Sequence, residues 1–263
     1  MIRFLFLIGL FVNLVSFSPP QPTLINPSSD NLFHKGTIFE YDLKTETDSG
    51  LISTEKRFYL VDSVFRDGKL IIANIQYCYK TEDGKFIKLL NYEARRDSFG
   101  VKIDIGHLLY LSSKDTNSDF AAHNVMVLYK DSMRPGQTYP GEKRKVTVQG
   151  GDINTTHTYK SGAVNTGNGQ TVPVYNSQES SAHIPTQTIV YNIGSRTVVA
   201  KESISVVAGN FNCYRIKFSC GEGEELIQMM DWYQPGQGFI KRRIIYPDGK
   251  KLTLELTSIT RPD

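Results

Sequence analysis

The sequence predicts an all-β protein built largely from antiparallel strand pairs. Three observations carry this prediction. Short segments alternate apolar and polar residues with a period of two, Asp-Gly turns join several of these segments, and no later stretch shows a sustained helical stripe with caps. The 14 Tyr, 14 Phe, 21 Gly and 11 Pro of the 263 residues also favour strands and turns. We expect one short helical turn, within Asp115–His123.

The first residues have the layout of a cleavable secretory signal. Arg3 is a short basic region, Phe4–Val15 is almost entirely apolar, and the small residues Ser16 and Ser18 follow. This apolar run is shorter than the roughly 20 residues that span a bilayer, so we expect residues 1–18 to be a signal peptide rather than an uncleaved anchor. No later segment approaches spanning length, and the mature chain is expected to be exported without a transmembrane span.

The rest of the chain divides into a leader and one domain. Residues 19–35 are rich in Pro and Ser and are expected to form an extended leader or tether. Residues 36–263 are expected to form a single β-rich domain. Its predicted strands, in order, include Tyr59–Phe65, Leu70–Tyr79, Phe86–Ala94, Ser203–Val207, Phe211–Cys220, Glu225–Tyr233, Phe239–Tyr246 and Leu252–Leu256.

Asp-Gly turns join three of the predicted pairs, at Asp67-Gly68, Asp83-Gly84 and Asp248-Gly249. Asp and Gly tolerate the positive φ that a hairpin turn matched to strand twist requires, so these are strong local hairpin signals. Three such turns predict an antiparallel meander.

The central segment, at about 150–187, differs in composition from the rest of the domain. It is dense in Gly, Asn, Ser and Thr with scattered apolar residues, which fits either a long loop or weak strands that cross between the two halves. Long loops often carry function, so this segment is a candidate partner site, and a solvated connector is the alternative.

The three cysteines do not form a disulfide framework. If Cys213 and Cys220 lie on one continuous strand, their separation of seven residues places them on opposite faces. Cys78 and Cys213 can pair only if their strands are neighbours, so their pairing is open. We expect them to be buried small apolar residues.

No motif for catalysis, metal binding or nucleotide binding is present. The five histidines are scattered without metal-ligand spacing, and Asp115–Asp119 lacks the glycine and the Glu that would complete an EF-hand. There is no Gly-x-Ser-x-Gly elbow and no phosphate loop. We therefore expect no catalytic residue, no metal, no cofactor and no enzyme activity.

Charge gives no support to a nucleic-acid partner. The 30 Lys and Arg nearly balance the 27 Asp and Glu, for a net charge of +3. The basic runs Lys143–Lys145 and Lys241–Arg243 are expected to be the wet face of a strand or a protected sheet edge.

The C-terminal third contains a turn motif of five residues that we single out as structural: Trp232, Tyr233, Pro235, Gly236 and Gly238. Pro235 presets φ at the first corner of a type II turn and Gly236 supplies the positive φ of the second. Gly238 leads into the next strand, and Trp232 and Tyr233 present one ring to each face.

The run Asp231–Lys241, which contains this motif, resembles the TapB-like family, a group of uncharacterised exported bacterial proteins. The preceding segment Ala208–Ile216 and the middle stretch Arg134–Pro140 share the resemblance. The resemblance is strongest in the last third of the chain. It implies an exported, all-β protein with a curved antiparallel sheet similar to the half-barrel of periplasmic lipoprotein carriers. A β-sandwich is the alternative fold class that we keep open. We expect the protein in the periplasm or at the cell surface of a Gram-negative bacterium. The resemblance supplies no catalytic residues.

Three functional hypotheses follow. The first is a non-enzymatic module that holds a lipid or other apolar or extended ligand on the concave face of the sheet. The second is a structural or assembly factor of the envelope that docks protein partners through sheet edges and the leader. The third is a polysaccharide hydrolase, which would need two carboxylates facing each other in a cleft. An unfilled apolar cavity would favour the first.

Overall fold

The computed structural model describes residues 30–106, 108, 125–148, 151–166, 170–184, 186–222 and 225–262. The expected signal peptide and residues 19–29 of the leader lie outside this part of the chain, as does the expected helical turn in Asp115–His123.

The all-β prediction is confirmed. The described chain forms one open, curved antiparallel sheet of 14 strands and a separate two-stranded sheet, so its long strands do not divide into the two packed sheets of a sandwich. A short 3-10 helix, η1 (Asn31–Phe33), precedes them. The strands are β1 (Ile38–Thr47), β2 (Gly50–Asp67), β3 (Leu70–Lys80), β4 (Phe86–Asp97), β5 (Gly100–Asp104), β6 (Met126–Tyr129), β7 (Thr138–Tyr139), β8 (Glu142–Val148), β9 (Gly151–Thr166), β10 (Gln170–Ile184), β11 (Gln187–Ile193), β12 (Arg196–Val206), β13 (Gly209–Glu222), β14 (Glu225–Gln234), β15 (Gly238–Ile245) and β16 (Lys251–Thr260).

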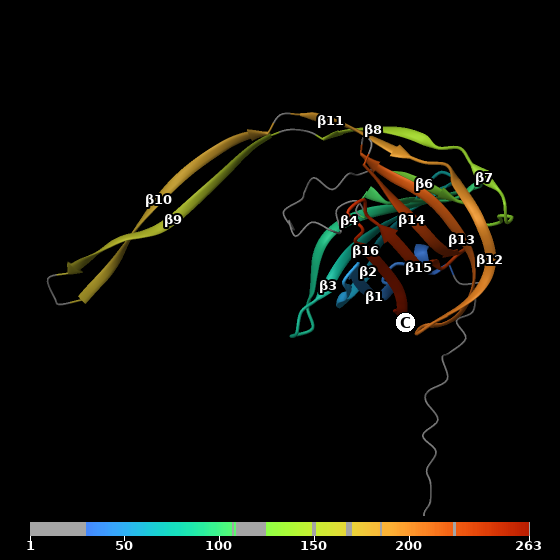
Figure 1. Cartoon of the computed structure of the whole chain (residues 1–263). Coiled ribbons are helices and arrows are strands. Elements are labelled where there is room, and N and C mark those ends of the chain that lie inside the picture. The colour runs from blue at the N-terminus through green and yellow to red at the C-terminus, as the bar shows by residue number, and fades with distance from the viewer. Residues whose placement is uncertain are drawn as a thin grey trace, which may run out of the picture.

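The strand order of the large sheet is β6-β5-β4-β3-β2-β1-β16-β15-β14-β13-β11-β8. The chain therefore begins and ends in the middle of the sheet, where β1 pairs with β16. Strand β12 pairs with β13 beside β11, and the short β7 pairs with β12. Figure 1 shows the strands curling around a common interior.

The three Asp-Gly turns form as predicted. Gly68, Gly84 and Gly249 have φ values of 58°, 85° and 83° and connect β2 to β3, β3 to β4 and β15 to β16. Because each turn is specified by its own few residues, the meander of the sheet follows directly from local sequence.

Irregular pairing helps the sheet to curl. Register shifts interrupt β1 at Glu40/Tyr41, β2 near Val61, β3 at Tyr77/Cys78 and β14 at Trp232/Tyr233. Such bulges bend a strand and increase its twist.

The curl brings the far strand β6 against β14 and β15. The ring of Tyr129 stacks on that of Tyr233 at 4.8 Å between centroids and meets Phe239 edge-on at 5.1 Å. The buried hydrophobic residues form one cluster that draws on β1 to β6 and β11 to β16. The interior of the curled sheet is therefore its core.

Strands β9 and β10 stand apart from this body, and we call the two together the arm (Figure 1). They pair with each other from Gln170↔Thr166 to Ile184↔Gly151 and belong to a sheet of their own. At the root of the arm, β8 pairs with β11 from Gln187↔Val148 onward, and β11 pairs with β13. The central segment is thus neither a loop nor strands that cross the sheet. It is one long hairpin that leaves the sheet edge and returns to it.

The last residues of the expected leader fold with the domain. Residues 30–35, assigned from sequence to a tether, include η1, in which Leu32 is 6% exposed and Asn31 is 1% exposed. Farther along the chain, Thr37 and Phe39 are buried and the residue between them, Ile38, is more exposed. Burial of Leu32 explains why the folded part reaches back to Asp30.

Candidate functional site

At the centre of the described interior lies an ion pair between neighbouring strands. Asp231 on β14 stands directly opposite Arg242 on β15. Arg242 donates from Nε to Asp231 Oδ1 at 2.5 Å and from Nη2 to Oδ2 at 2.9 Å. The hydroxyl of Tyr129 donates to Asp231 Oδ2 at 2.7 Å. The side chain of Arg242 is 4% exposed and that of Asp231 is 0% exposed, so water screens this ion pair very little.

The surroundings keep Arg242 charged. Burial lowers the pKa of Arg242, but the adjacent Asp231 carboxylate outweighs burial and raises the pKa above its ordinary value. The Phe239 ring lies 3.6 Å from the guanidinium carbon and adds a cation–π contact. Burial, and next the Asp231 charge, raise the pKa of Tyr129 well above its usual value, so its hydroxyl keeps its proton and can donate.

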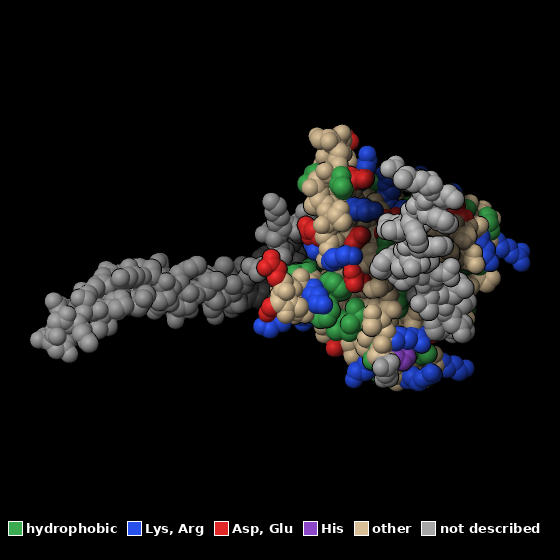
Figure 2. Space-filling model, turned by 90° about the horizontal axis from the view of Figure 1, so that it is seen from below, with side chains coloured by type: hydrophobic (Ala, Val, Ile, Leu, Met, Phe, Trp, Pro, Cys, Tyr) green, Lys and Arg blue, Asp and Glu red, His purple; other side chains and the backbone are tan. Residues whose placement is uncertain are grey.

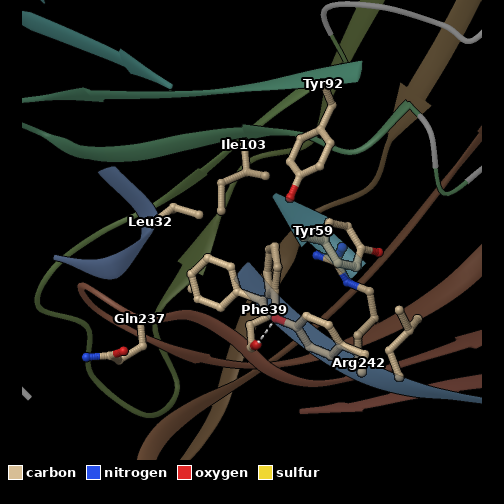
Figure 3. A pocket seen from close by; sticks show the side chains of 11 residues that line it. Leu32, Phe39, Tyr59, Tyr92, Ile103, Gln237 and Arg242 are labelled. Carbon is tan, nitrogen blue, oxygen red and sulfur yellow. Dashed lines mark hydrogen bonds between the residues drawn. The ribbon is translucent and has the colours of Figure 1, made fainter. Parts of the chain in front are cut away.

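Beside this pair is a small pocket lined mainly by aromatic and aliphatic residues (Figure 3). The Arg242 guanidinium lies next to Tyr59, and Tyr92 points its hydroxyl toward them. The Tyr41 hydroxyl donates to the Phe239 carbonyl at 2.6 Å. The lining consists of Leu32, Phe39, Tyr41, Tyr59, Tyr92, Ile103, Gln237, Gly238, Phe239, Arg242 and Leu254.

The pocket has room for water rather than for an acyl chain. Its volume is about 20 Å³, and one water needs about 10–15 Å³ by this measure. Burial raises the pKa values of Tyr41, Tyr59 and Tyr92, so these hydroxyls stay neutral. No carboxylate, thiol or imidazole is among the lining residues. The arrangement can hold a small polar molecule, but its lining offers no general base.

Helix η1 closes one end of this pocket. Leu32 contributes to the lining, and the side chain of Asn31 hydrogen-bonds with Gln237 and accepts from Arg261. Just before η1, Asp30 forms an ion pair with Arg96. Leu32 therefore seals the described pocket from the side of the N-terminal segment.

Of the five turn-motif residues, Gly238 lines this pocket, and the others build the β14–β15 turn and the strand end beside it. Gly236 has a φ of 79°, and Gln237 N donates to Gln234 O at 3.1 Å across the turn. Tyr233 is 0% exposed and faces the core. Trp232 lies on the other face, where its Nε1 donates to Glu202 Oε1 at 2.7 Å.

Pro235 sits in the turn itself, and Gly238, with a φ of 90°, begins β15 against Leu32. The turn motif thus positions the residues that close the pocket. The one ionisable side chain among the five is the phenol of Tyr233, and burial raises its pKa above the ordinary value.

Sequence reasoning missed Arg242, because it assigned the whole run Lys241–Arg243 to a wet face or an edge. The structure corrects this for the middle residue: Arg242 is 4% exposed and shares the inner face with Ile240 and Ile244, which are both 0% exposed. The period-two alternation of Ile240, Arg242 and Ile244 was the available signal. For the run in β8 the expectation fits, since Lys143, Arg144 and Lys145 are exposed on the terminal strand of the sheet.

The three cysteines are free and buried, as expected. Burial raises the pKa of Cys78, and it raises those of Cys213 and Cys220 to about 12. Because the thiolate is the nucleophile, none of them is poised for nucleophilic chemistry.

Within the described residues, no group of three or more His, Cys, Asp and Glu could hold a metal ion. The exposed His34 belongs to no such group, and Asp115–Asp119 lies outside the described residues. None of the helices in the described residues has the length and apolarity needed to cross a membrane. Figure 2 shows positive and negative side chains interleaved on the face it presents.

The second candidate surface is the arm. Its strands have 16 and 15 residues, so it is roughly 50 Å long at about 3.3 Å per residue. The outer edges of β9 and β10 pair with no other described strand. Asp152, Lys160 and Glu179 are the charged residues in these two strands. A long edge with so few charges lacks the usual protection against pairing with another chain.

Comparison with known proteins identifies no family. No family model matches the chain, and no curated protein gives a significant match. Among solved structures, a candidate lipoprotein of Parabacteroides distasonis has 16% identity and a TM-score of 0.46, over 87% of this chain and 96% of the other. A candidate exported protein with a YmcC-like fold from Bacteroides fragilis has 13% identity and a TM-score of 0.47, over 87% and 97%.

The hypothetical lipoprotein YmcC from Escherichia coli has 6% identity and a TM-score of 0.30, over 85% of this chain and 87% of the other. All three TM-scores lie below 0.5, so the fold class rests on the strand pairing of this chain itself. The resemblance to the TapB-like family is not tested by these comparisons and stays a prediction.

Proposed function

We propose that this chain is a non-enzymatic, exported envelope protein that docks a protein partner by strand addition to its arm. The observation that carries the proposal is the arm itself, a long hairpin rooted in the sheet whose outer edges pair with no other described strand. An isolated two-stranded hairpin is at best marginally stable in water, and a third strand with further side-chain contacts stabilises it. Strand addition supplies both through main-chain hydrogen bonds.

The two edges of the arm are not equivalent. Pro173 of β10 stands opposite Ala163 of β9 and has no N–H to donate. Proline is tolerated in a ladder where its nitrogen faces away from the partner strand, so it removes a donor from the outer edge of β10. Strand β9 contains no proline over its whole length. We therefore assign docking to the outer edge of β9.

The packed interior supports this choice over a ligand on the concave face. The buried hydrophobic cluster fills the curled sheet, and the pocket beside Arg242 offers about 20 Å³. Ligand pockets are also expected to carry polar groups that converge on the ligand, whereas Arg242 is already engaged by Asp231.

Site-specific photo-crosslinking in the exporting cells tests the proposal. A photoreactive residue at Thr156 in the middle of β9 is expected to give a discrete adduct, identified by mass spectrometry. The same residue at Lys217, which is exposed on β13 of the body, is the control and is expected to give none. No adduct from Thr156, or the same adducts from both positions, would overturn arm docking.

The aromatic lining of the pocket favours a second candidate, in which an apolar ligand enters when η1 moves aside. Replacing Leu32 by Ala removes the side chain that closes the pocket. If this candidate holds, an environment-sensitive naphthylamine probe binds more tightly to the variant than to the parent chain. Absence of probe binding to both proteins contradicts it.

A further inference from the structure

Two copies of β9 placed antiparallel, edge to edge, have complementary residues opposite each other. Resting on the proposed docking function, we infer that the partner of the arm is a second copy of this chain, joined by antiparallel β9–β9 pairing about a two-fold axis at Thr156. The two arms then form a four-stranded sheet in the order β10-β9-β9-β10.

Strand geometry restricts the register. The outward N–H and C=O groups of a strand edge recur at every second residue, so an edge that pairs with its own copy must place residues of the same parity opposite each other. Strand β9 pairs regularly with β10 from Gly151 to Lys160, and Ser161 lies at the irregularity. The regular stretch is therefore where a two-fold ladder forms.

Within that stretch, the register centred on Thr156 places residues of opposite charge opposite each other. Position 152 of one copy stands opposite position 160 of the other, and the two-fold repeats this pair, so Asp152 meets Lys160 twice. The same register places Ile153 opposite Tyr159, also twice. Opposite charges and aromatic–aliphatic pairs are the cross-strand combinations that stabilise an antiparallel ladder.

In the register of the arm, neither charged position of β9 stands opposite an Asp, Glu, Lys or Arg of β10. The residues of β10 that face Asp152 and Lys160 are His183 and Tyr175. Charge complementarity for this edge is thus supplied by the second copy. A two-fold interface of one surface with itself is also the commonest form of homo-oligomer.

Charge reversal on the full exported chain tests the pairing, with sedimentation velocity over a wide concentration range at low salt. Lys160→Glu and Asp152→Lys each place like charges opposite at two positions. We expect each to weaken the dimer roughly tenfold or more. The double variant Asp152→Lys/Lys160→Glu restores opposite charges and is expected to recover the dimer.

Glu179→Lys on β10 is the matched control and is expected to leave dimerisation unchanged, because β10 is outside the paired edge. Across the hairpin the two substituted positions stand opposite His183 and Tyr175 rather than opposite Asp, Glu, Lys or Arg. A chain that is monomeric at all concentrations, or dimerises equally well in all variants, overturns self-pairing.

The crosslinking at Thr156 separates this outcome from the docking function. An adduct with a different protein overturns self-pairing and leaves docking in place. The absence of any adduct overturns docking itself. An adduct between two differently tagged copies of the chain supports both.

Discussion

Two hairpins of this protein, β14–β15 and β9–β10, differ in what covers them. The first is sealed in the body: Tyr233, Ile240 and Arg242 are buried, and β6 lies over them through Tyr129. The second pairs only with itself among the described strands. The same backbone pattern thus serves to build a core in one place and to present an open edge in the other.

The two hairpins also differ in their charged residues, and the buried one contains an ion pair. The sealed hairpin contains a buried ion pair, while the open arm is poor in charge. The terminal strand β8 has exposed Lys143, Arg144 and Lys145, the usual protection of an edge. The chain therefore protects the sheet edge at β8 and leaves β9, a few residues later, without that protection. This contrast supports the proposed pairing at β9.

The largest effect is expected from breaking the sealed hairpin at its centre. Replacing Arg242 by Met leaves the Asp231 carboxylate buried without its cation, so we expect a loss of about 3–5 kcal/mol in the free energy of unfolding. Denaturant unfolding measures it. The double variant Asp231→Leu/Arg242→Met removes both charges and is expected to be considerably more stable than the single one. A single variant that loses under about 1 kcal/mol contradicts a buried pair.

The contrast between the two hairpins also explains what could be predicted from sequence. The Asp-Gly turns at Gly68, Gly84 and Gly249 were predictable because positive φ is a local requirement. The burial of one face of β15 was not predictable, because a run of three basic residues indicates exposure to solvent. Asp231 and Tyr129, which make burial of Arg242 tolerable, lie 11 and 113 residues away in the sequence.

The arm was missed for the opposite reason. Its Gly, Asn, Ser and Thr content resembles a loop, and no buried partner of the body imposes an alternating apolar pattern on it. Its role as a candidate partner site came from length and composition, whereas its hairpin geometry required the register of β9 and β10. The closing helix η1 was assigned to the leader, since one buried leucine in a Pro- and Ser-rich segment gives little signal.

A smaller effect is expected from removing one hydroxyl from the sealed region. Tyr129→Phe keeps the stacked ring and deletes the hydrogen bond to the Asp231 carboxylate, so we expect a loss of about 2 kcal/mol. Tyr41→Phe is the control, because its hydroxyl donates to the neutral carbonyl of Phe239 and should contribute about 1 kcal/mol. Equal losses in the two variants would argue against a special contribution from the charged acceptor.

A pH effect is expected on the outer face of the same region. Burial raises the pKa of Glu255, but hydrogen bonds from Lys241 and Lys44, each 2.6 Å long, outweigh burial and hold the pKa below its ordinary 4.5. A lowered pKa in the folded state means that this stabilisation is present above the unfolded pKa and is lost as pH falls through the folded pKa.

We therefore expect Glu255→Gln to flatten the stability profile below about pH 4.5. At neutral pH the variant should lose less than about 1 kcal/mol, because the group is partly exposed and salt screens it. Denaturant midpoints across the acidic range measure this. Parallel profiles for the variant and the parent chain would show that Glu255 is not the responsible carboxylate.

The smallest effect on stability is expected from removing the arm. Joining Val148 to Gln187 by a short Gly-Ser turn deletes β9 and β10 and keeps the β8–β11 pairing that begins at these two residues. Since β9 and β10 pair only with each other among the described strands, we expect the free energy of unfolding of the body to change by no more than about 0.5 kcal/mol. Dimerisation should disappear in the same variant. Loss of an integral strand would cost several kcal/mol, so a large destabilisation here would mean that the arm packs on the body and that its edge is not free to dock. Unchanged stability together with lost association would assign the core to the curled sheet and recognition to the arm.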